Sequence, residues 1–198
     1  MYAASAGNSA RNCSTASQAD ASNRLLITIS GLPGAGTSTV AKLVADALGL
    51  ERVDGGTVFR AMARERGLDV NEFSRVAEGD AEIDLELDQR LAERVKQGDV
   101  VLESRLAGWI ATNEGVPATR VWIDAAEEER ARRVAAREEA SEAATLAANQ
   151  DRERSERHRY RTYYGIDLDD RSVYDLVIDS TAAAPDDLAK SIVEAAST

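Results

Sequence analysis

The sequence has a single cysteine, Cys13, a single histidine, His158, and only three lysines, at positions 42, 96 and 190. One cysteine cannot form an internal disulfide, and without a cysteine or second histidine as partner, His158 is not expected to bind a metal. No run of 18 apolar residues occurs, so no transmembrane helix is expected, and the N-terminus lacks the features of a secretory signal. These absences favour an intracellular protein, which we expect in the cytoplasm.

Positive charge is in the minority and almost entirely arginine. The chain has 35 acidic and 24 basic residues, for a net charge of -11. An acidic surface repels nucleic acids and membrane headgroups, so we expect neither as a partner. The bias suits a high-salt cytoplasm, but a GC-rich genome would also favour arginine over lysine, so both explanations stay open.

The length and composition suit one globular domain. Of the 198 residues, 43% are hydrophobic and 30% are charged, which is enough apolar material for a sizeable core. Residues 1–23 are rich in alanine, serine and asparagine and show no apolar periodicity. They predict a disordered tail, and a misplaced translation start is an equal alternative. The folded domain is predicted over residues 24–198.

Apolar runs and helical periodicities alternate along that domain. Strands are predicted at Leu25–Ser30, Leu50–Asp54, Asp99–Ser104, Thr119–Asp124 and Tyr174–Ser180. Helices are predicted at 38–49, Thr57–Arg66, Ile83–Gln97, Ala126–Glu139, Asn149–Tyr164 and Pro185–Ala196. The alternation predicts an α/β fold with three α/β/α layers around a five-stranded parallel sheet. Ligands of such folds bind at the carboxyl ends of the strands.

The segment ISGLPGAGTST nearly matches the phosphate-binding P-loop pattern G-x-x-x-x-G-K-[ST]. Gly31, Gly36 and Ser38 fit the pattern, but Thr37 replaces the lysine. Inward-turned N–H groups and the N-terminus of the following helix favour phosphate, and Ser38 is the expected Mg²⁺ ligand. The alternative is a plain glycine-rich turn. The predicted nucleotide-binding residues are Gly31, Leu32, Pro33, Gly34, Ala35, Gly36, Thr37, Ser38 and Thr39.

Two further segments place charged side chains at predicted strand ends. In DGGTVFR, Arg60 lies one helical turn after the strand ending at Asp54, where it could clamp a second phosphate or simply be a solvated surface arginine. In VVLESR, Glu103 ends a strand and could orient Mg²⁺-bound water or act on the acceptor, with a strand-end salt bridge as the alternative. Arg105 follows as another candidate phosphate clamp.

Arginines are concentrated in residues 129–139 and 151–161. Glu–Arg pairs four residues apart on a solvated helix explain the first group, including Glu129 with Arg133. The second group has excess positive charge in an acidic protein, which indicates an anionic ligand such as a phosphoryl group. His158 within it is interpreted as a surface residue.

Together, the segments from about Leu25 to Ser180 resemble the nucleoside monophosphate kinases, and among them the archaeal type of cytidylate kinase. The most specific blocks are DGGTVFRAMARERGLDVNEF and VVLESRLAGWI. The resemblance implies transfer of the γ-phosphoryl group of ATP to CMP or dCMP with Mg²⁺. It also implies a single P-loop kinase domain with a monophosphate-binding insert at about 55–97 and an arginine-rich lid at about 137–161.

The resemblance also implies roles for individual residues. Arg60 and Arg105 would hold the phosphate of the acceptor, and Asp54 would head the monophosphate-binding segment. Arg152 and Arg159 would close on the transferring group, with Glu156 between them orienting one. The charge that Thr37 does not supply could come from arginines at positions 133, 137, 152 or 159. We expect small-molecule nucleotides as the partners of a monomer.

Two other functions stay open at this stage. The chain could be a kinase for another nucleotide or a small metabolite, since the sequence has no clear base-recognition signature. It could also be a nucleotide-binding protein without catalysis, with a degenerate P-loop. The presence of Ser38, Glu103 and several well-placed arginines argues against that second alternative.

Overall fold

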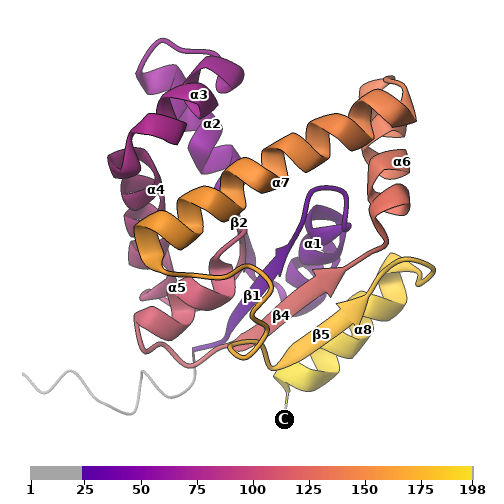
Figure 1. The fold of residues 1–198 in the computed structure, drawn as a ribbon. Coiled ribbons are helices and arrows are strands. Elements are labelled where there is room, and N and C mark those ends of the chain that lie inside the picture. Colours follow the sequence, from indigo (N-terminus) through magenta and orange to yellow (C-terminus); the bar gives the residue numbers. More distant parts are fainter. Residues whose placement is uncertain (1–23, 198) are drawn as a thin grey trace, which may run out of the picture.

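A computed structural model of the chain describes residues 24–197, and the predicted tail over residues 1–23 lies outside them. Figure 1 shows a twisted sheet between layers of helices. Its strands are β1 (Leu26–Gly31), β2 (Glu51–Asp54), β3 (Val100–Glu103), β4 (Thr119–Asp124) and β5 (Leu176–Asp179). They are ordered β2-β3-β1-β4-β5, and every neighbouring pair is parallel. The predicted α/β fold with a five-stranded parallel sheet is therefore confirmed.

The helices account for most of the remaining residues. They are α1 (Thr37–Leu48), α2 (Gly55–Glu65), α3 (Val70–Gly79), α4 (Ala81–Val95), α5 (Ala107–Asn113), α6 (Glu127–Glu138), α7 (Glu142–Tyr164) and α8 (Pro185–Ala196). None of the helices within residues 24–197 combines the length and the apolar character that crossing a bilayer requires.

The sequence-based prediction was wrong at three helices. It omitted α3 and α5, and it began α7 at Asn149 instead of Glu142. Local hydrogen bonds explain two of these differences. At the start of α3, Asp69 and Glu72 each accept a bond from the other's backbone N–H, which is a reciprocal helix cap. At the start of α7, Ser141 accepts from the N–H of Ala144, so the helix includes the alanine-rich segment.

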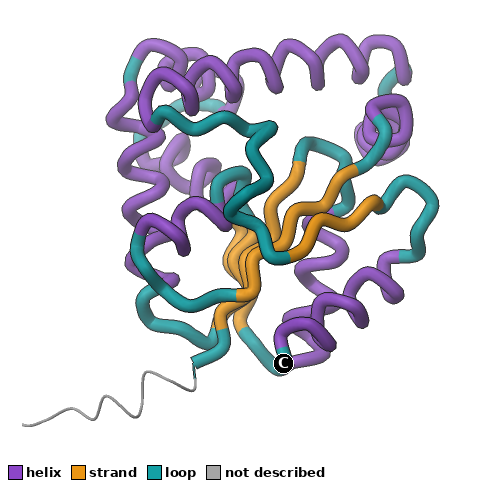
Figure 2. The backbone as a smooth tube through the Cα atoms, turned by 60° about the horizontal axis from the view of Figure 1, so that its bottom comes forward, coloured by secondary structure: helices purple, strands orange, loops and turns teal. Residues whose placement is uncertain are grey.

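Alternation along the strands divides the core into two layers. Ile27 and Ile29 of β1 pack with α1 and α8 on one face of the sheet. Leu26, Leu102 and Trp122 pack with α4 and α5 on the other. Figure 2 shows the strands between these two groups of helices. Because both faces of the central strands β1 and β3 are buried, these strands are rich in apolar residues, and this made them recognisable in the sequence.

Helix α7 crosses the carboxyl-terminal side of the sheet, from α6 to the region of α4 and α5 (Figure 1). It has 23 residues, and its buried positions include Glu153, Glu156 and Tyr160. A helix that buries two carboxylates must pair them with cations. Glu156 pairs with Arg105 just after β3 and so connects α7 to the strand ends, whereas Glu153 pairs with Arg130 of α6.

Candidate active site

The loop between β1 and α1 has a backbone that only glycine can adopt at two positions. Gly34 has φ 82° and Gly36 has φ 89°. A Cβ atom on Gly34 would lie 2.4 Å from the carbonyl oxygen of Arg130, so α6 packs directly against the loop. Gly36 occupies the residue before α1 and allows the chain to enter the helix.

Four carbonyl oxygens of this loop accept hydrogen bonds from side chains of other segments. Their donors are Arg105 to Gly31, Arg130 to Pro33 (3.2 Å), Arg133 to Gly34 (3.4 Å) and the Ser180 hydroxyl to Ala35 (2.8 Å). Among residues 24–197, no partner bonds the N–H groups of Gly34, Gly36, Thr37 or Ser38. Free N–H groups at a helix N-terminus form a cradle that fits the phosphates of a nucleotide.

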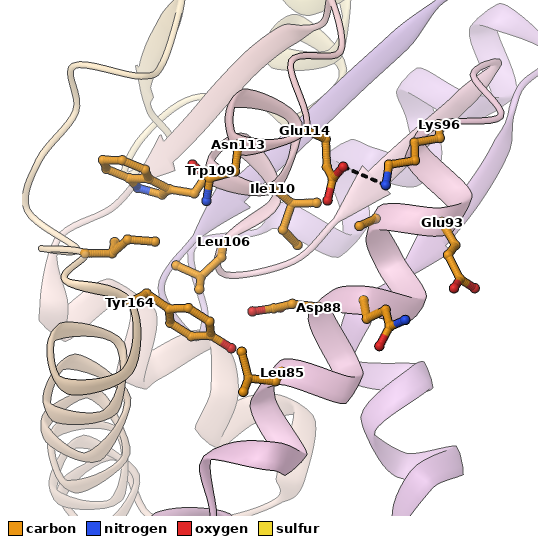
Figure 3. Close-up of a pocket in the computed structure, with 13 residues that line it drawn as sticks. Leu85, Asp88, Glu93, Lys96, Leu106, Trp109, Ile110, Asn113, Glu114 and Tyr164 are labelled. Carbon is orange, nitrogen blue, oxygen red and sulfur yellow. Dashed lines mark ion pairs between the residues drawn. The ribbon is translucent and has the colours of Figure 1, made fainter. Parts of the chain in front are cut away.

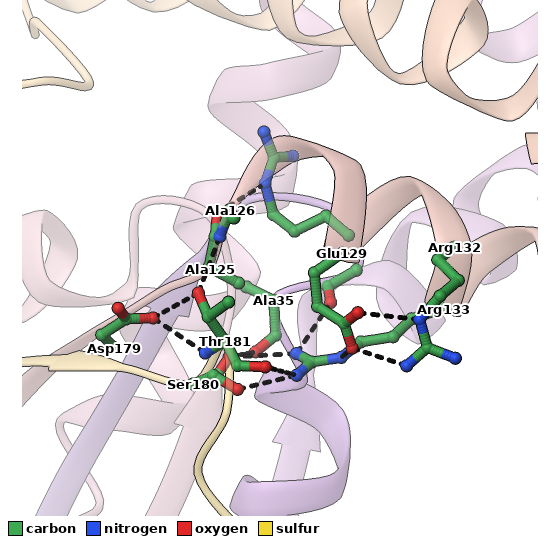
Figure 4. Close-up of polar contacts among 11 residues, drawn as sticks. Ala35, Ala125, Ala126, Glu129, Arg132, Arg133, Asp179, Ser180 and Thr181 are labelled. Carbon is green, nitrogen blue, oxygen red and sulfur yellow. Dashed lines mark hydrogen bonds and ion pairs between the residues drawn. The ribbon is translucent and has the colours of Figure 1, made fainter. Parts of the chain in front are cut away.

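Arg133 connects α6 to this cradle and to the segment after β5 (Figure 4). It pairs with Glu129 at 2.7 Å, as the sequence predicted, and donates to the carbonyl oxygen of Ser180 at 2.7 Å. The same guanidinium bonds the Ser180 hydroxyl at 3.0 Å. Arg133 therefore stabilises the loop through hydrogen bonds to backbone carbonyl oxygens, and it also forms an ion pair with Glu129. Arg137, the other candidate on α6, is well exposed, and among residues 24–197 it pairs with Glu138 alone.

Glu103 lies directly beside the serine predicted to bind Mg²⁺. Its Oε1 accepts from the hydroxyls of Thr37 at 2.8 Å and Ser38 at 2.5 Å. Its Oε2 accepts from Arg52 at 2.9 Å. Glu103 thus forms the strand-end salt bridge that was one of its two expected roles, and it also contacts two hydroxyls of the phosphate loop. Its expected role toward Mg²⁺ or the acceptor stays a prediction. Arg52 was not predicted, because its partner lies on the neighbouring strand.

Two oxygen-bearing side chains lie where a divalent cation is expected. Ser38 and Glu103 supply a hydroxyl and a carboxylate, the ligand types that Mg²⁺ prefers. In the part of the chain that the structure describes, no group of three or more His, Cys, Asp or Glu residues could hold a metal. A site with few protein ligands fits Mg²⁺, which usually completes its shell with water and substrate phosphates.

Asp54 and Arg60 form a small polar group at the start of α2. Asp54 caps the helix by accepting from the N–H of Gly56 at 2.9 Å and from the Thr57 hydroxyl at 2.6 Å. Arg60 lies against them, 3.3 Å from Asp54, with its side chain 49% exposed. The structure therefore places Arg60 beside Asp54 while leaving half of it open to a ligand.

Glu156 joins two of the predicted phosphate-binding arginines. Its Oε2 accepts from Nε of Arg105 and its Oε1 from Nε of Arg152, both at 2.8 Å. Burial alone would raise the pKa of this carboxyl, but the two guanidinium groups outweigh burial and hold the pKa at about 2. Arg105 lies after β3 and Arg152 on α7, so one carboxylate links the strand ends to the helix above them.

Arg159 lies apart from that pair, although the sequence grouped it with Arg152. Its Nη1 donates to both carboxylate oxygens of Asp84 on α4, at 2.8 and 2.7 Å. Asp84 is only 4% exposed, and burial raises its pKa although Arg159 opposes the shift. The pair joins α7 to the predicted insert, together with a 2.9 Å bond between Ser155 and Glu78.

A cavity of about 280 Å³ lies between α4 and α5 (Figure 3). Asp88, Trp109 and Tyr164 contribute to its lining. Burial raises the pKa of Asp88 to about 6, and the negative charge of Asp84 adds to the shift. None of the predicted site residues lines this cavity.

The raised pKa of Asp88 predicts a pH effect on stability. Between its unfolded pKa of about 4 and its folded value, the folded protein binds a proton that the unfolded chain releases, so stability falls as pH rises. Asp88→Asn removes this loss. Going from pH 4 to pH 7, the free energy of unfolding of Asp88→Asn in urea should therefore rise by roughly 1–3 kcal/mol relative to that of wild type, which means greater relative stability at pH 7. A difference that is constant over that range would contradict the assignment.

The comparisons with known proteins agree with this geometry. A family model described as the cytidylate kinase-like family matches residues 26–182. The chain belongs to this family. It is 48% identical to the cytidylate kinase of Methanocaldococcus jannaschii over 158 residues, which cover 79% of this chain and 89% of that protein. It is 45% identical to the cytidylate kinase of Halobacterium salinarum over 172 residues, covering 86% and 88% of the two chains.

The fold comparison extends beyond cytidylate kinases. A shikimate kinase from Acinetobacter baumannii superposes with a TM-score of 0.57 over 87% of this chain and 93% of that chain, at 17% identity. Identity at that level shows the fold alone. This cytidylate kinase-like chain is therefore built on a fold that also serves kinases with other acceptors.

The structure brings the predicted residues into two groups. Thr37, Ser38 and Glu103 form one, and Arg105 with Arg152 forms the other through Glu156. Sequence reasoning did not identify three partners of the predicted residues. Arg52 pairs with Glu103, Arg130 bonds the carbonyl oxygen of Pro33, and Asp84 pairs with Arg159. Arg130 is a buried arginine paired with Glu153 of α7, and only its apolar neighbours on α6 hinted that it faces inward.

Proposed function

We propose that the chain transfers the γ-phosphoryl group of ATP to CMP, and to dCMP, giving ADP and the corresponding diphosphate. Family membership and the adjacency of the N–H cradle to Glu103 and Arg105 support this proposal. The observation that carries it is the carboxylate of Glu103, which contacts the hydroxyls of the phosphate loop and lies two residues before Arg105. Donor and acceptor groups therefore start from one strand end.

In this proposal, the donor phosphates lie in the cradle formed by Gly31–Thr39. The backbone N–H groups and the N-terminus of α1 bind and orient them. Ser38 and Glu103 would hold Mg²⁺, which when bound neutralises charge between the phosphates. The hydrogen bonds that other side chains donate to the loop's carbonyl oxygens hold its backbone in place, so its N–H groups stay available for the phosphates.

The acceptor's phosphate lies at Arg105 and Arg60 in this proposal, and Arg152 faces the transferring group. Within residues 24–197, Nη2 of Arg105 and both terminal nitrogens of Arg152 have no hydrogen bond, so each can donate to a phosphate. An oxygen of the acceptor's phosphate attacks the γ-phosphorus, and the bond to the oxygen of ADP breaks. Positive charge around the equatorial oxygens stabilises the transition state. Because Arg159 bonds Asp84, we assign it to the acceptor rather than to the transferring group.

We also propose that residues 55–97 form a monophosphate-binding insert and residues 137–161 a lid within one kinase domain over 24–198. Such kinases must exclude water to avoid wasting ATP, so these parts are expected to close around the substrates. The bonds from α7 to α4 give the two parts a direct connection. We propose that this enzyme works as a monomer in the cytoplasm on small-molecule nucleotides.

Thr37→Lys tests whether the loop lacks a necessary charge. The Thr37 hydroxyl bonds Glu103, and Arg52 already pairs with that carboxylate, so the site contains one cation and one anion without a lysine. An introduced lysine would compete with Arg52 for Glu103. We expect kcat/KM for CMP to change less than about threefold or to fall, because the gain from one more cation is offset by the disturbed pair. A large gain in coupled-assay rate would show instead that the loop is impaired.

A panel of acceptors, assayed with ATP at low and high salt, tests the proposed function. We expect CMP and dCMP to be the preferred acceptors. Phosphorylation of AMP or shikimate without activity on CMP would contradict the proposal. Tight ATP binding without turnover of any monophosphate would favour the non-catalytic alternative.

A further inference from the structure

Asp84 and Arg159 form a buried polar pair that phosphoryl transfer does not use. Asp84 lies in the first turn of α4, next to its N-terminus, and its side chain points toward α7. The side chains of the pair are 5% and 11% exposed. A buried ion pair is weak support for stability, since apolar residues of similar size often do as well, so its presence calls for another explanation.

The pair has unused hydrogen-bonding capacity. A single nitrogen, Nη1 of Arg159, serves both oxygens of Asp84. The Nε of Arg159 is buried without any partner among the residues that the structure describes. A buried donor left unpaired is costly, and each carboxylate oxygen can accept another bond. The pair therefore presents at least one free donor beside free acceptor positions.

The place of the pair along α7 relates it to the acceptor. Glu156 holds Arg105, where we place the acceptor's phosphate, and Arg159 follows three residues later on the same helix. At 1.5 Å per residue, this is an advance of about 4.5 Å along the helix axis, away from the phosphate loop. A nucleotide with its phosphate at Arg105 and its base extending in this direction would bring the base to Asp84 and Arg159.

We propose that Asp84, oriented by Arg159, recognises the base of the acceptor as an aminopyrimidine. The carboxylate accepts from the exocyclic amine of cytosine, as Asp and Glu do at that group in other complexes, and the free guanidinium N–H donates to a ring acceptor. Uracil has a carbonyl oxygen in place of the amine, and it would face the carboxylate with two acceptors opposed. This assignment rests on the proposed function, because it supplies the base recognition for the same acceptor site.

Asp84→Asn should change which base is accepted. The asparagine amide can donate to the carbonyl oxygen of uracil, while the side chain keeps its size and one acceptor for Arg159. We expect the ratio of kcat/KM for CMP to that for UMP to fall at least about tenfold, from steady-state assays at fixed ATP. Calorimetric affinities for CMP and UMP without ATP should shift in the same direction. If Asp84 had a merely structural role, the substitution would lower kcat/KM for both substrates together and leave their ratio unchanged.

Asp88→Asn is the matched control, since it makes the same change one turn farther along α4. Its ratio of kcat/KM for CMP to kcat/KM for UMP should stay as in wild type. If Asp84→Asn does not fold, Asp84→Glu keeps the charge but moves the carboxylate, and it should lower the same ratio. A ratio within twofold of wild type in the folded Asp84 variants would overturn the assignment.

Failure of this assignment can be separated from failure of the proposed function. Wild-type protein that binds CMP no more tightly than UMP overturns the base recognition, whether or not turnover occurs. Preferential CMP binding that depends on Asp84, with no turnover of CMP, supports the base recognition and contradicts the kinase proposal.

Discussion

Replacing Arg105 with alanine is expected to lower kcat/KM for CMP by about 100-fold or more. The guanidinium is only 17% exposed, lies between Glu156 and the phosphate loop, and has a free Nη2 for a phosphate. Loss of one partner from such a desolvated charge contact typically costs ~3 kcal/mol or more of transition-state stabilisation, which corresponds to a loss of about 100-fold in kcat/KM. Steady-state kinetics with CMP and ATP varied separately will give the value and show which substrate is affected.

Two comparisons separate this effect from unfolding. Arg154→Ala on α7 removes an arginine that pairs only with exposed Asp151, so its activity should stay close to wild type. Arg105→Ala leaves the buried Glu156 with Arg152 as its remaining partner, so its urea unfolding must be measured alongside. A folded Arg105→Ala protein with less than a threefold loss would remove Arg105 from the site.

Glu103→Gln should lower kcat by roughly 100-fold with a smaller change in the KM for CMP. The carboxylate holds the hydroxyls of Thr37 and Ser38 and pairs with Arg52, so the neutral amide loses charge where we place Mg²⁺. Removal of one electrostatic contact at a phosphoryl-transfer site commonly costs ~3 kcal/mol. The Mg²⁺ concentration needed for half-maximal rate should rise as well.

Glu51→Gln is the control for that substitution. Glu51 begins β2 and pairs with Arg94 at the opposite end of the sheet, with its side chain 62% exposed. We expect no change in Mg²⁺ dependence there. If Glu103→Gln loses activity with an unaltered Mg²⁺ requirement, then Glu103 acts on the loop hydroxyls rather than on the metal.

Elements buried on both faces were predictable from the sequence. β1 and β4 have mainly apolar residues at their centres because helices cover both sides of the sheet. The phosphate loop was recognisable because Gly34 and Gly36 require positive φ, a local property of the chain. Asp69 and Glu72 form a reciprocal cap at the start of α3, and such a cap is a local signal that a sequence contains. The prediction still missed this helix because its sequence is polar.

Partners distant in the sequence were not predictable. Arg52 meets Glu103 only because β2 and β3 are neighbours, with Asp54 opposite Glu103 in the register. Asp84 meets Arg159 across 75 residues, through the way α7 crosses α4. No local pattern encodes such pairs in a single sequence. The arginine-rich helix therefore predicted an anionic ligand, but not which arginine contacts which group.

The spacing of charges on α7 restricts how this helix can vary. Glu153, Glu156 and Arg159 follow each other at intervals of three residues and bond Arg130, Arg105 and Asp84. Inserting or deleting one residue between them would rotate everything beyond it by about 100° around the helix axis and separate at least one pair. Exposed positions such as Arg154 can accept many substitutions, whereas the number of residues from 153 to 159 must be kept. The spacing of these three residues along α7 thus fixes the distance between the phosphate loop and α4.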